Sequence, residues 1–249
     1  MDFAALLSEE KRKAAQQRKA AAADKSHRVE EPTTPKQENV DDVSPTHTTM
    51  KGLPPLSFEP RYPLPHGLVP FRECDSIDSV YLVPEWISPT EEDSILERVH
   101  AAPLWVQLKH RRLQVHGGTV TTTYEPTPLP TWLQVLSASL VDMQIFDAAH
   151  APNHTLINEY TPGDGILPHE DGPMYHPLVA ILSLGSEARM TFRRHRQVPP
   201  SPSPPSHLHV PRRSLLLFTA EAYTEHLHSI DNVGPVGTRV SLTIRHALP

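Results

Sequence analysis

Short apolar segments separated by turn residues dominate the second half of the chain. From His154 onward, five segments have the length and residue types of β-strands. We expect strands in HTLINEY, LVAILSLG, ARMTFRR, RRSLLLFTA and RVSLTIRHAL. Several short strands without intervening helices predict a sandwich, a jelly roll or a small barrel.

A strand and a helix are predicted ahead of this region. SVYLVPEW, which begins at Ser79, has the pattern of a short strand, and we expect the ordered part of the chain to begin there. SPTEEDSILERV has the signature of a helix start, with Ser88 as N-cap, Pro89 at the first helical position and Glu91 completing a capping box. The residues that would face the core are Ile95, Leu96 and Val99.

A second helix is predicted in LPTWLQVLSASLVDMQIF, with Leu133, Leu136 and Leu140 on one side. The two helices precede the run of strands. The fold class that we expect is therefore mainly β with flanking helices, an α+β arrangement in which the N-terminal helices pack on the β core.

The first 75 residues differ in composition from the rest. Residues 2–23 are rich in helix formers, but their apolar stripe is thin. Residues 24–57 are polar and contain scattered prolines, which is typical of disorder. We expect a largely disordered tail over 1–75 with a helix at 2–23, and one domain over 76–249. The helix is either solvated or folds onto a protein partner through Phe3, Leu6 and Leu7.

Composition restricts the class of protein. The formal net charge is −6, which argues against a wholly electrostatic nucleic-acid binder but allows local basic patches. The single cysteine, Cys74, rules out an internal disulfide and fits a reducing compartment. No run approaches the roughly 18 apolar residues of a membrane span, and the N-terminus lacks a signal-peptide core. We expect a soluble intracellular monomer in the nucleus, the cytoplasm or both.

Two segments place polar side chains at strand spacing. In RVSLTIR the polar side chains share one face, and the apolar side chains share the other. Such a face is either solvated or forms a cationic surface that receives an anion, because arginine can bind a carboxylate through two parallel hydrogen bonds. Asn158 and Tyr160 share a face in the same way. The polar residues of RVSLTIR are Arg239, Ser241, Thr243 and Arg245.

The segment LPHEDGPMYHP contains a candidate metal site. If the backbone is extended, His169 and Asp171 lie on one face and Glu170 points away. Two histidines and one carboxylate on one octahedral face leave three positions open, which suits non-haem Fe(II). His-x-Asp alone has limited specificity, because the chain contains 16 histidines, and the third ligand has to come from elsewhere.

The order of these segments resembles the AlkB family of Fe(II)/2-oxoglutarate dioxygenases. The resemblance extends from Ser79 to Leu248 and consists of Asn-x-Tyr, His-x-Asp, a later histidine and a closing strand with two arginines. Ser241 stands where the closing motif of the family has asparagine, which should shorten one contact with the co-substrate. The resemblance implies a double-stranded β-helix, or jelly roll, as the core of the domain.

The resemblance also implies roles for individual residues. His169 and Asp171 become metal ligands, and AYTEHLHSI offers either His226 or His228 as the third; we choose His228 because it precedes a small residue and Ile. Asn158 and Tyr160 would hydrogen-bond 2-oxoglutarate. Of the two arginines of the closing strand, Arg239 would pair with the distal carboxylate of the co-substrate and Arg245 would support the co-substrate or the target base.

A basic segment, Lys109 to Gly118, resembles the lid with which several AlkB proteins hold the target nucleotide. Lys109, Arg111 and Arg112 would contact phosphates, and His116 would stack on a base. The alternative is a basic surface loop. Two further segments, the basic cluster at 193–196 and the proline-rich insertion at 198–211, are surface features or elements at the rim of the site.

Membership of this family would define the chemistry. Fe(II) would act with 2-oxoglutarate and O2 as co-substrates. The reaction would hydroxylate a C–H bond, commonly of an N-methyl group, which then leaves as formaldehyde. A nucleic-acid substrate would have to be single-stranded or flipped out of its stack. The alternatives are the same chemistry on a protein or small molecule, or a binding module that has kept only the fold.

Overall fold

The structure is a computed structural model, and it describes most of the chain beyond residue 76. The predicted helix at 2–23 lies outside the described residues, so the helix and the domain division at residue 75 both stay predictions. The described residues are 54–58, 68, 73–74, 77–195, 204–231, 233–234 and 236–249.

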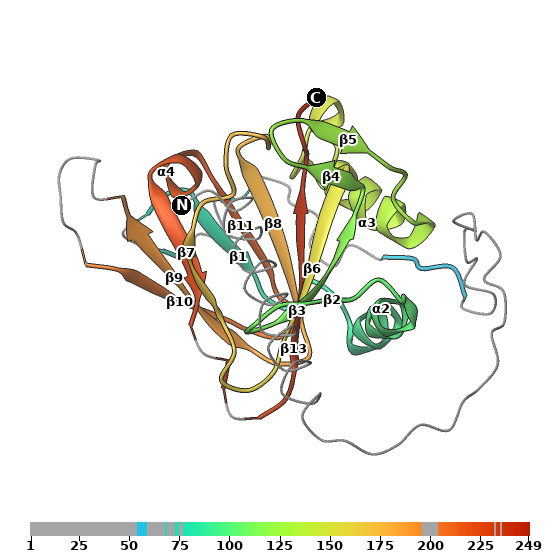
Figure 1. The fold of residues 1–249 in the computed structure, drawn as a ribbon, viewed down its shortest axis with the longest axis horizontal. Coiled ribbons are helices and arrows are strands. Elements are labelled where there is room, and N and C mark those ends of the chain that lie inside the picture. Colours follow the sequence, from blue (N-terminus) through green and yellow to red (C-terminus); the bar gives the residue numbers. More distant parts are fainter. Residues whose placement is uncertain are drawn as a thin grey trace, which may run out of the picture.

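Two antiparallel sheets form the core (Figure 1). The larger has seven strands in the order β1-β11-β8-β13-β6-β3-β2, and the smaller has four in the order β10-β9-β12-β7. The strands of the larger sheet are β1 (Val80–Val83), β11 (Leu215–Thr219), β8 (Leu178–Leu184), β13 (Arg239–Arg245), β6 (His154–Tyr160), β3 (Arg112–His116) and β2 (Val106–Gln107). Those of the smaller sheet are β10 (Ser206–Val210), β9 (Ala188–Arg194), β12 (His226–Ile230) and β7 (Ile166–His169).

The two sheets form the jelly roll, and side chains from both fill the space between them. Phe192 of β9 and Phe218 of β11 meet there at 5.5 Å between ring centroids. On β13 the polar and apolar side chains separate as the period of two predicts. Val240, Leu242 and Ile244 join the apolar cluster on the opposite face of the sheet, under the helices. The predicted mainly β architecture is confirmed.

Two helices cover the outer face of the larger sheet, α2 (Pro89–Ala101) and α3 (Thr131–Asp142) (Figure 1). The capping box on α2 is present, because Ser88 Oγ accepts from Glu91 N at 3.2 Å and Glu91 Oε2 accepts from Ser88 N at 2.5 Å. The second helix ends at Asp142, four residues before the predicted end, and Gln144 has the positive φ of 60° that lets the chain turn away. A short 3-10 helix, η2 (Ala148–His150), and a short helix, α4 (Ala220–Thr224), complete the helical elements of the described chain.

The predicted strands match the structure closely. The bounds of β6 and β9 agree with HTLINEY and ARMTFRR, and the others are shorter than predicted by a few residues. The proline-rich stretch is a correction, because its second half forms β10 rather than a loop. Leu208 and Val210 of that strand are buried at alternate positions, which gives it a core face. A separate hairpin, β4 (Gly118–Val120) with β5 (Tyr124–Pro126), follows β3.

The basic segment at 109–118 is also a correction. It is a hairpin turn followed by β3, which pairs with β6 inside the larger sheet. Arg112 lies over Trp105 at 4.2 Å and binds Glu159 through its Nε at 2.5 Å. His116 is buried beside Trp132, with Nε2 3.0 Å from Gln114 Oε1. This burial contradicts the prediction that His116 stacks on a base.

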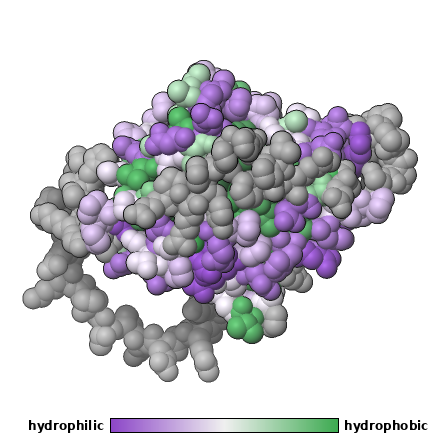
Figure 2. All heavy atoms as spheres, turned by 180° about the vertical axis from the view of Figure 1, so that it is seen from behind, coloured by the Kyte–Doolittle hydropathy of each residue, from purple (hydrophilic) through white to green (hydrophobic). Residues whose placement is uncertain are grey.

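Apolar side chains are well covered on the described surface. Seen from behind, hydrophilic side chains form broad areas and hydrophobic ones gather in small patches (Figure 2). The large hydrophobic side chains that stay exposed among the described residues are Leu104, Val106, Leu167 and Val236. In the described part of the chain, no helix is both long enough and apolar enough to span a membrane.

We expect Glu92→Ala to destabilise the fold by about 3 kcal/mol. Glu92 in the first turn of α2 is fully buried, where it accepts from Gly185 N at 2.7 Å and from Arg212 Nε at 2.8 Å. Its loss leaves the Gly185 N–H and the guanidinium of Arg212, which is 45% exposed, without this buried acceptor. Urea unfolding checks the value, with the exposed Asp93→Ala as control. Equal stability of the two variants would contradict the structure.

We also expect His116 to make the fold sensitive to acid. Burial lowers the pKa of His116 from 6.5 to about 4, so the unfolded chain takes up a proton before the folded chain does. The contribution of His116 to the free energy of unfolding is fully present above about pH 6.5 and is lost as the pH falls towards about 4. The total loss amounts to about 3 kcal/mol.

Urea unfolding between pH 7 and about pH 4 tests this expectation. His116→Gln should flatten the dependence of the unfolding free energy on pH, because glutamine has no proton to gain. The exposed His209→Gln should leave it unchanged. An unaltered slope in His116→Gln would show that another group causes the acid sensitivity.

Candidate functional site

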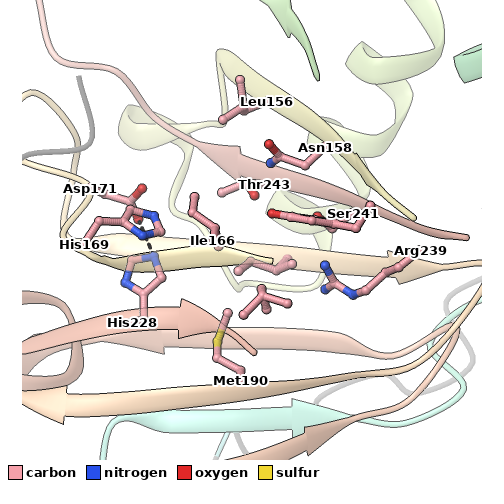
Figure 3. Close-up of a pocket in the computed structure, with 13 residues that line it drawn as sticks. Leu156, Asn158, Ile166, His169, Asp171, Met190, His228, Arg239, Ser241 and Thr243 are labelled. Atoms are coloured by element: carbon pink, nitrogen blue, oxygen red, sulfur yellow. Dashed lines mark ion pairs between the residues drawn. The ribbon is translucent and has the colours of Figure 1, made fainter. Parts of the chain in front are cut away.

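A cavity between the two sheets gathers most of the residues singled out in the sequence (Figure 3). Strands β6 and β13 of the larger sheet provide one wall, and β7, β9 and β12 provide the opposite one. Two histidines and a carboxylate lie at one end of the view, and Arg239 lies at the other. Apolar side chains line the space between the two ends, among them Ile166, Ile181 and Met190.

His169, Asp171 and His228 form the cluster at the first end. Their ligand atoms lie within 4.8 Å of one another, and all three side chains are buried. His169 ends β7 and is the cross-strand partner of His228 on β12, so the sheet itself brings the two imidazoles together. His226 is not in the cluster, and its Nδ1 lies 3.0 Å from the carbonyl oxygen of Glu221.

The environment keeps both imidazoles neutral. Burial lowers the pKa of His169 well below its usual value, and the neighbouring His228 lowers it further. Burial also lowers the pKa of His228, although Asp171 opposes this. His169 Nδ1 lies 2.8 Å from the carbonyl oxygen of Leu167, so Nδ1 carries the proton and Nε2 keeps its lone pair. This is the tautomer that binds a metal, with its second nitrogen held by a carbonyl.

Arg245 orients Asp171. Arg245 Nη1 donates to Asp171 Oδ1 in a buried ion pair, and its guanidinium lies 3.9 Å from the ring centroid of Tyr175. The second carboxylate oxygen, Oδ2, is buried without a hydrogen-bond partner among the described groups and lies 3.9 Å from His228 Nε2. One oxygen is therefore fixed, and the other is directed to where a metal would bind. Glu170 points away, as predicted, with Oε2 3.3 Å from His195 Nε2.

Arg239 provides the positive charge at the other end. Its side chain is 1% exposed, its Nη2 donates to Ser183 Oγ at 3.0 Å, and it lies 5.6 Å from the ring of Tyr160. Its Nε and Nη1 are buried with no hydrogen-bond partner among the described groups. Ser241 lines the wall between Arg239 and the cluster. Two orphaned donors on one buried guanidinium fit a carboxylate that binds from inside the cavity.

Arg111 belongs to the site in a way that the sequence did not reveal. The predicted phosphate contact is contradicted, because Arg111 is 2% exposed and its Nε donates to Asn158 Oδ1 at 3.0 Å. Arg111 lies on the inward side of the alternation that continues through Leu113 of β3. The sequence also did not point to Tyr175, which contacts Arg245, or to Ser183, which accepts from Arg239. The alternation of RRLQVH was the signal that could have placed Arg111.

Buried arginine side chains gather around the cavity. The guanidinium groups of Arg111, Arg239 and Arg245 are buried, and so is the carboxylate of Asp171. Two donors of Arg239 have no hydrogen-bond partner among the described groups, which is costly unless a ligand accepts from them. 2-Oxoglutarate carries two carboxylates, so its charge, the orphaned donors of Arg239 and the histidine–aspartate cluster all fit an iron site with this co-substrate.

Comparisons with known proteins agree with this geometry. The family model of the 2OG-Fe(II) oxygenase superfamily matches residues 79–245. The "Probable RNA/DNA demethylase ALKBH6" of Danio rerio is 36% identical over an alignment of 176 positions, and the match covers 56% of this chain and 72% of the relative. The "tRNA (carboxymethyluridine(34)-5-O)-methyltransferase ALKBH8" of Mus musculus is 32% identical over an alignment of 130 positions, and the match covers 49% of this chain and 19% of that protein.

The solved structure of OsALKBH1 is similar in fold. It superposes with a TM-score of 0.52 over 67% of this chain and 97% of that one, at 15% identity, and thus supports the jelly-roll architecture alone. The family model and the Danio rerio relative carry the assignment of the family. The chain belongs to the 2OG-Fe(II) oxygenase superfamily and, within it, to the AlkB family of dioxygenases.

Proposed function

We propose that the cavity binds Fe(II) through His169, Asp171 and His228 and 2-oxoglutarate through Arg239, and that the enzyme oxidatively demethylates N-alkylated bases in nucleic acid. The observation that carries the proposal is the pairing of a buried histidine–aspartate–histidine cluster with a buried arginine that keeps two donors for a ligand. The bound iron supplies activation of O2, coupled to conversion of 2-oxoglutarate into succinate and carbon dioxide.

The protein residues position the reactants and exclude water. Arg239 pairs with the distal carboxylate, while Asn158 and Tyr160 on the adjacent strand β6 donate to the co-substrate from the same wall. Arg245 holds one oxygen of Asp171 and so fixes the orientation of the carboxylate. The apolar residues between the two ends keep water from the reacting centre.

Binding of 2-oxoglutarate gives the most direct test of the residues. With Mn(II) in place of Fe(II), 2-oxoglutarate at about 100 times its Kd should raise the Tm by roughly 5–10 °C. Arg239→Met should weaken its binding about 100-fold, because two charge-assisted hydrogen bonds are lost. Calorimetry measures the Kd of 2-oxoglutarate for the unmodified chain and for Arg239→Met. The control is Arg189→Met, which removes a largely exposed arginine bound to Asp231 on the outer face of the smaller sheet.

Unchanged affinity in Arg239→Met would show that the co-substrate binds elsewhere. Arg239→Lys keeps the charge but loses the bidentate geometry, and should bind with an intermediate affinity. Loss of binding in Arg189→Met as well would point to a general effect on folding.

A nucleic-acid substrate is supported by a small set of surface residues. Lys109 is exposed at the β2–β3 turn, and Arg112 is half-exposed, so both can contact phosphates. His110 at the same turn lies 3.9 Å from Asp164, beside the loop that connects β6 and β7 at the cavity. The similarity to the "Probable RNA/DNA demethylase ALKBH6" of Danio rerio supports the same class of substrate.

The second candidate is the same oxidation of a protein side chain or small molecule. The burial of Arg111 and His116 favours it, because two of the four residues predicted to contact nucleic acid are engaged inside the protein. The excess of acidic residues points in the same direction.

Succinate formation separates these candidates. With Fe(II) and a panel of methylated single-stranded oligonucleotides, we expect turnover that depends on one oligonucleotide and falls by at least about 1000-fold in Asp171→Ala. Asp231→Ala, on the outer face, is the matched control and should retain activity. Turnover that ignores every oligonucleotide but is lost in Asp171→Ala would favour a protein or small-molecule substrate. No succinate from the unmodified chain would contradict the proposed function.

A further inference from the structure

Arg111 is buried next to the co-substrate wall but does not belong to the residues that the proposed function uses. The hairpin between β2 and β3 closes at this residue, where Leu108 N donates to Arg111 O at 2.9 Å. Lys109 and His110 form the exposed tip of the turn. The next residue, Arg111, turns inward, and β3 then pairs with β6 so that Leu113 lies opposite Asn158.

The hydrogen bond between Arg111 and Asn158 determines the orientation of an amide. A guanidinium group offers only donors, so the group of Asn158 that meets Arg111 Nε at 3.0 Å must be the carbonyl oxygen, Oδ1. The amide nitrogen then points to the other side. Figure 3 shows this nitrogen on the side of the cavity where Thr243 lies. Asn158 itself is 4% exposed, so bulk solvent has little access to either end of the amide.

The orientation matters because the two ends of an amide have opposite effects on a carboxylate. The Nδ2 group donates to a carboxylate oxygen, whereas Oδ1 would repel it. Without a donor behind it, the amide of Asn158 could rotate about its terminal bond and present either end. A fixed amide has its donor in place before the ligand arrives, which removes an ordering step from binding.

From these contacts we infer that Arg111 is a positioning residue that fixes Asn158 with its amide donor towards 2-oxoglutarate. This inference rests on the proposed function, because it assigns a role at the same site. Arg111 acts through Asn158 rather than on the reacting atoms, and it acts on the co-substrate rather than on a nucleic-acid phosphate. Its burial and its contact with Asn158 separate it from Lys109, which stays exposed at the tip of the turn.

A double-mutant cycle tests the inference on the full chain loaded with Mn(II). The variants are Arg111→Met, Asn158→Ala and the double variant, and calorimetry measures the Kd of 2-oxoglutarate for each. We expect Arg111→Met to weaken binding about 10-fold in the unmodified background and less than about 2-fold in the Asn158→Ala background. Arg111→Lys should recover part of the affinity, because an ammonium group can still donate to Oδ1.

Kinetics provide the second measurement. In Arg111→Met the KM for 2-oxoglutarate should rise by about the same factor as the Kd, whereas the KM for the methylated oligonucleotide should not change. Arg189→Met again serves as control. Circular dichroism and the Tm show whether each variant folds, and Arg111→Leu, which also removes the donors, replaces Arg111→Met if that variant does not fold.

Two results would overturn the inference. The first is unchanged affinity for 2-oxoglutarate in Arg111→Met, or in Arg111→Leu where that variant takes its place. The second is a full 10-fold loss in both backgrounds, because Arg111 would then act independently of Asn158. Either result leaves the proposed function intact as long as the unmodified chain binds 2-oxoglutarate. Absence of binding by the unmodified chain contradicts the proposed function itself.

Discussion

The buried guanidinium of Arg239 constrains this protein more than any other single group. Its side chain is 1% exposed, and its Nε and Nη1 have no hydrogen-bond partner among the described groups. A buried cation with unsatisfied donors costs stability unless an anion completes the arrangement. The space between the two sheets is therefore suited to an anionic ligand that binds against Arg239.

Strand β13 organises the ends of the cavity. Its seven residues place Arg239 at one terminus and Arg245 at the other, about 20 Å apart along an extended chain. Arg239 reserves two donors for an anion, while Arg245 engages Asp171 and so leaves one carboxylate oxygen for a metal. The alternate, apolar residues of the same strand pack under the helices in the buried core. This packing holds the strand, and with it the two arginines, in place. One strand thus connects the stability of the fold to the geometry of the site.

The sequence predicts the parts of the site that lie on single strands. A period of two is enough to place Arg239, Ser241, Thr243 and Arg245 on one face, and capping chemistry is enough to begin α2 at Pro89. Alternation does not distinguish His226 from His228, because both share a face. The cross-strand partnership of His228 with His169 distinguishes them, and that depends on how β12 pairs with β7.

The basic segment at 109–118 shows why the burial of Arg111 and His116 was not predicted. Its charges suggested a surface loop, but β3 finds its partner β6 more than forty residues further along the chain, and this pairing buries Arg111 and His116. Such long-range pairing overrides the local preference of charged residues for solvent. The result is that Arg111 lies behind Asn158 rather than on the surface.

The central claim is that the histidine–aspartate cluster and Arg239 together bind one iron and one 2-oxoglutarate. An anaerobic titration with Fe(II) and 2-oxoglutarate, followed by visible absorption, tests it most directly. A charge-transfer band that needs both components and saturates at one equivalent of each is the result that the structure leads us to expect. Visible absorption that stays flat with both components present would contradict the account.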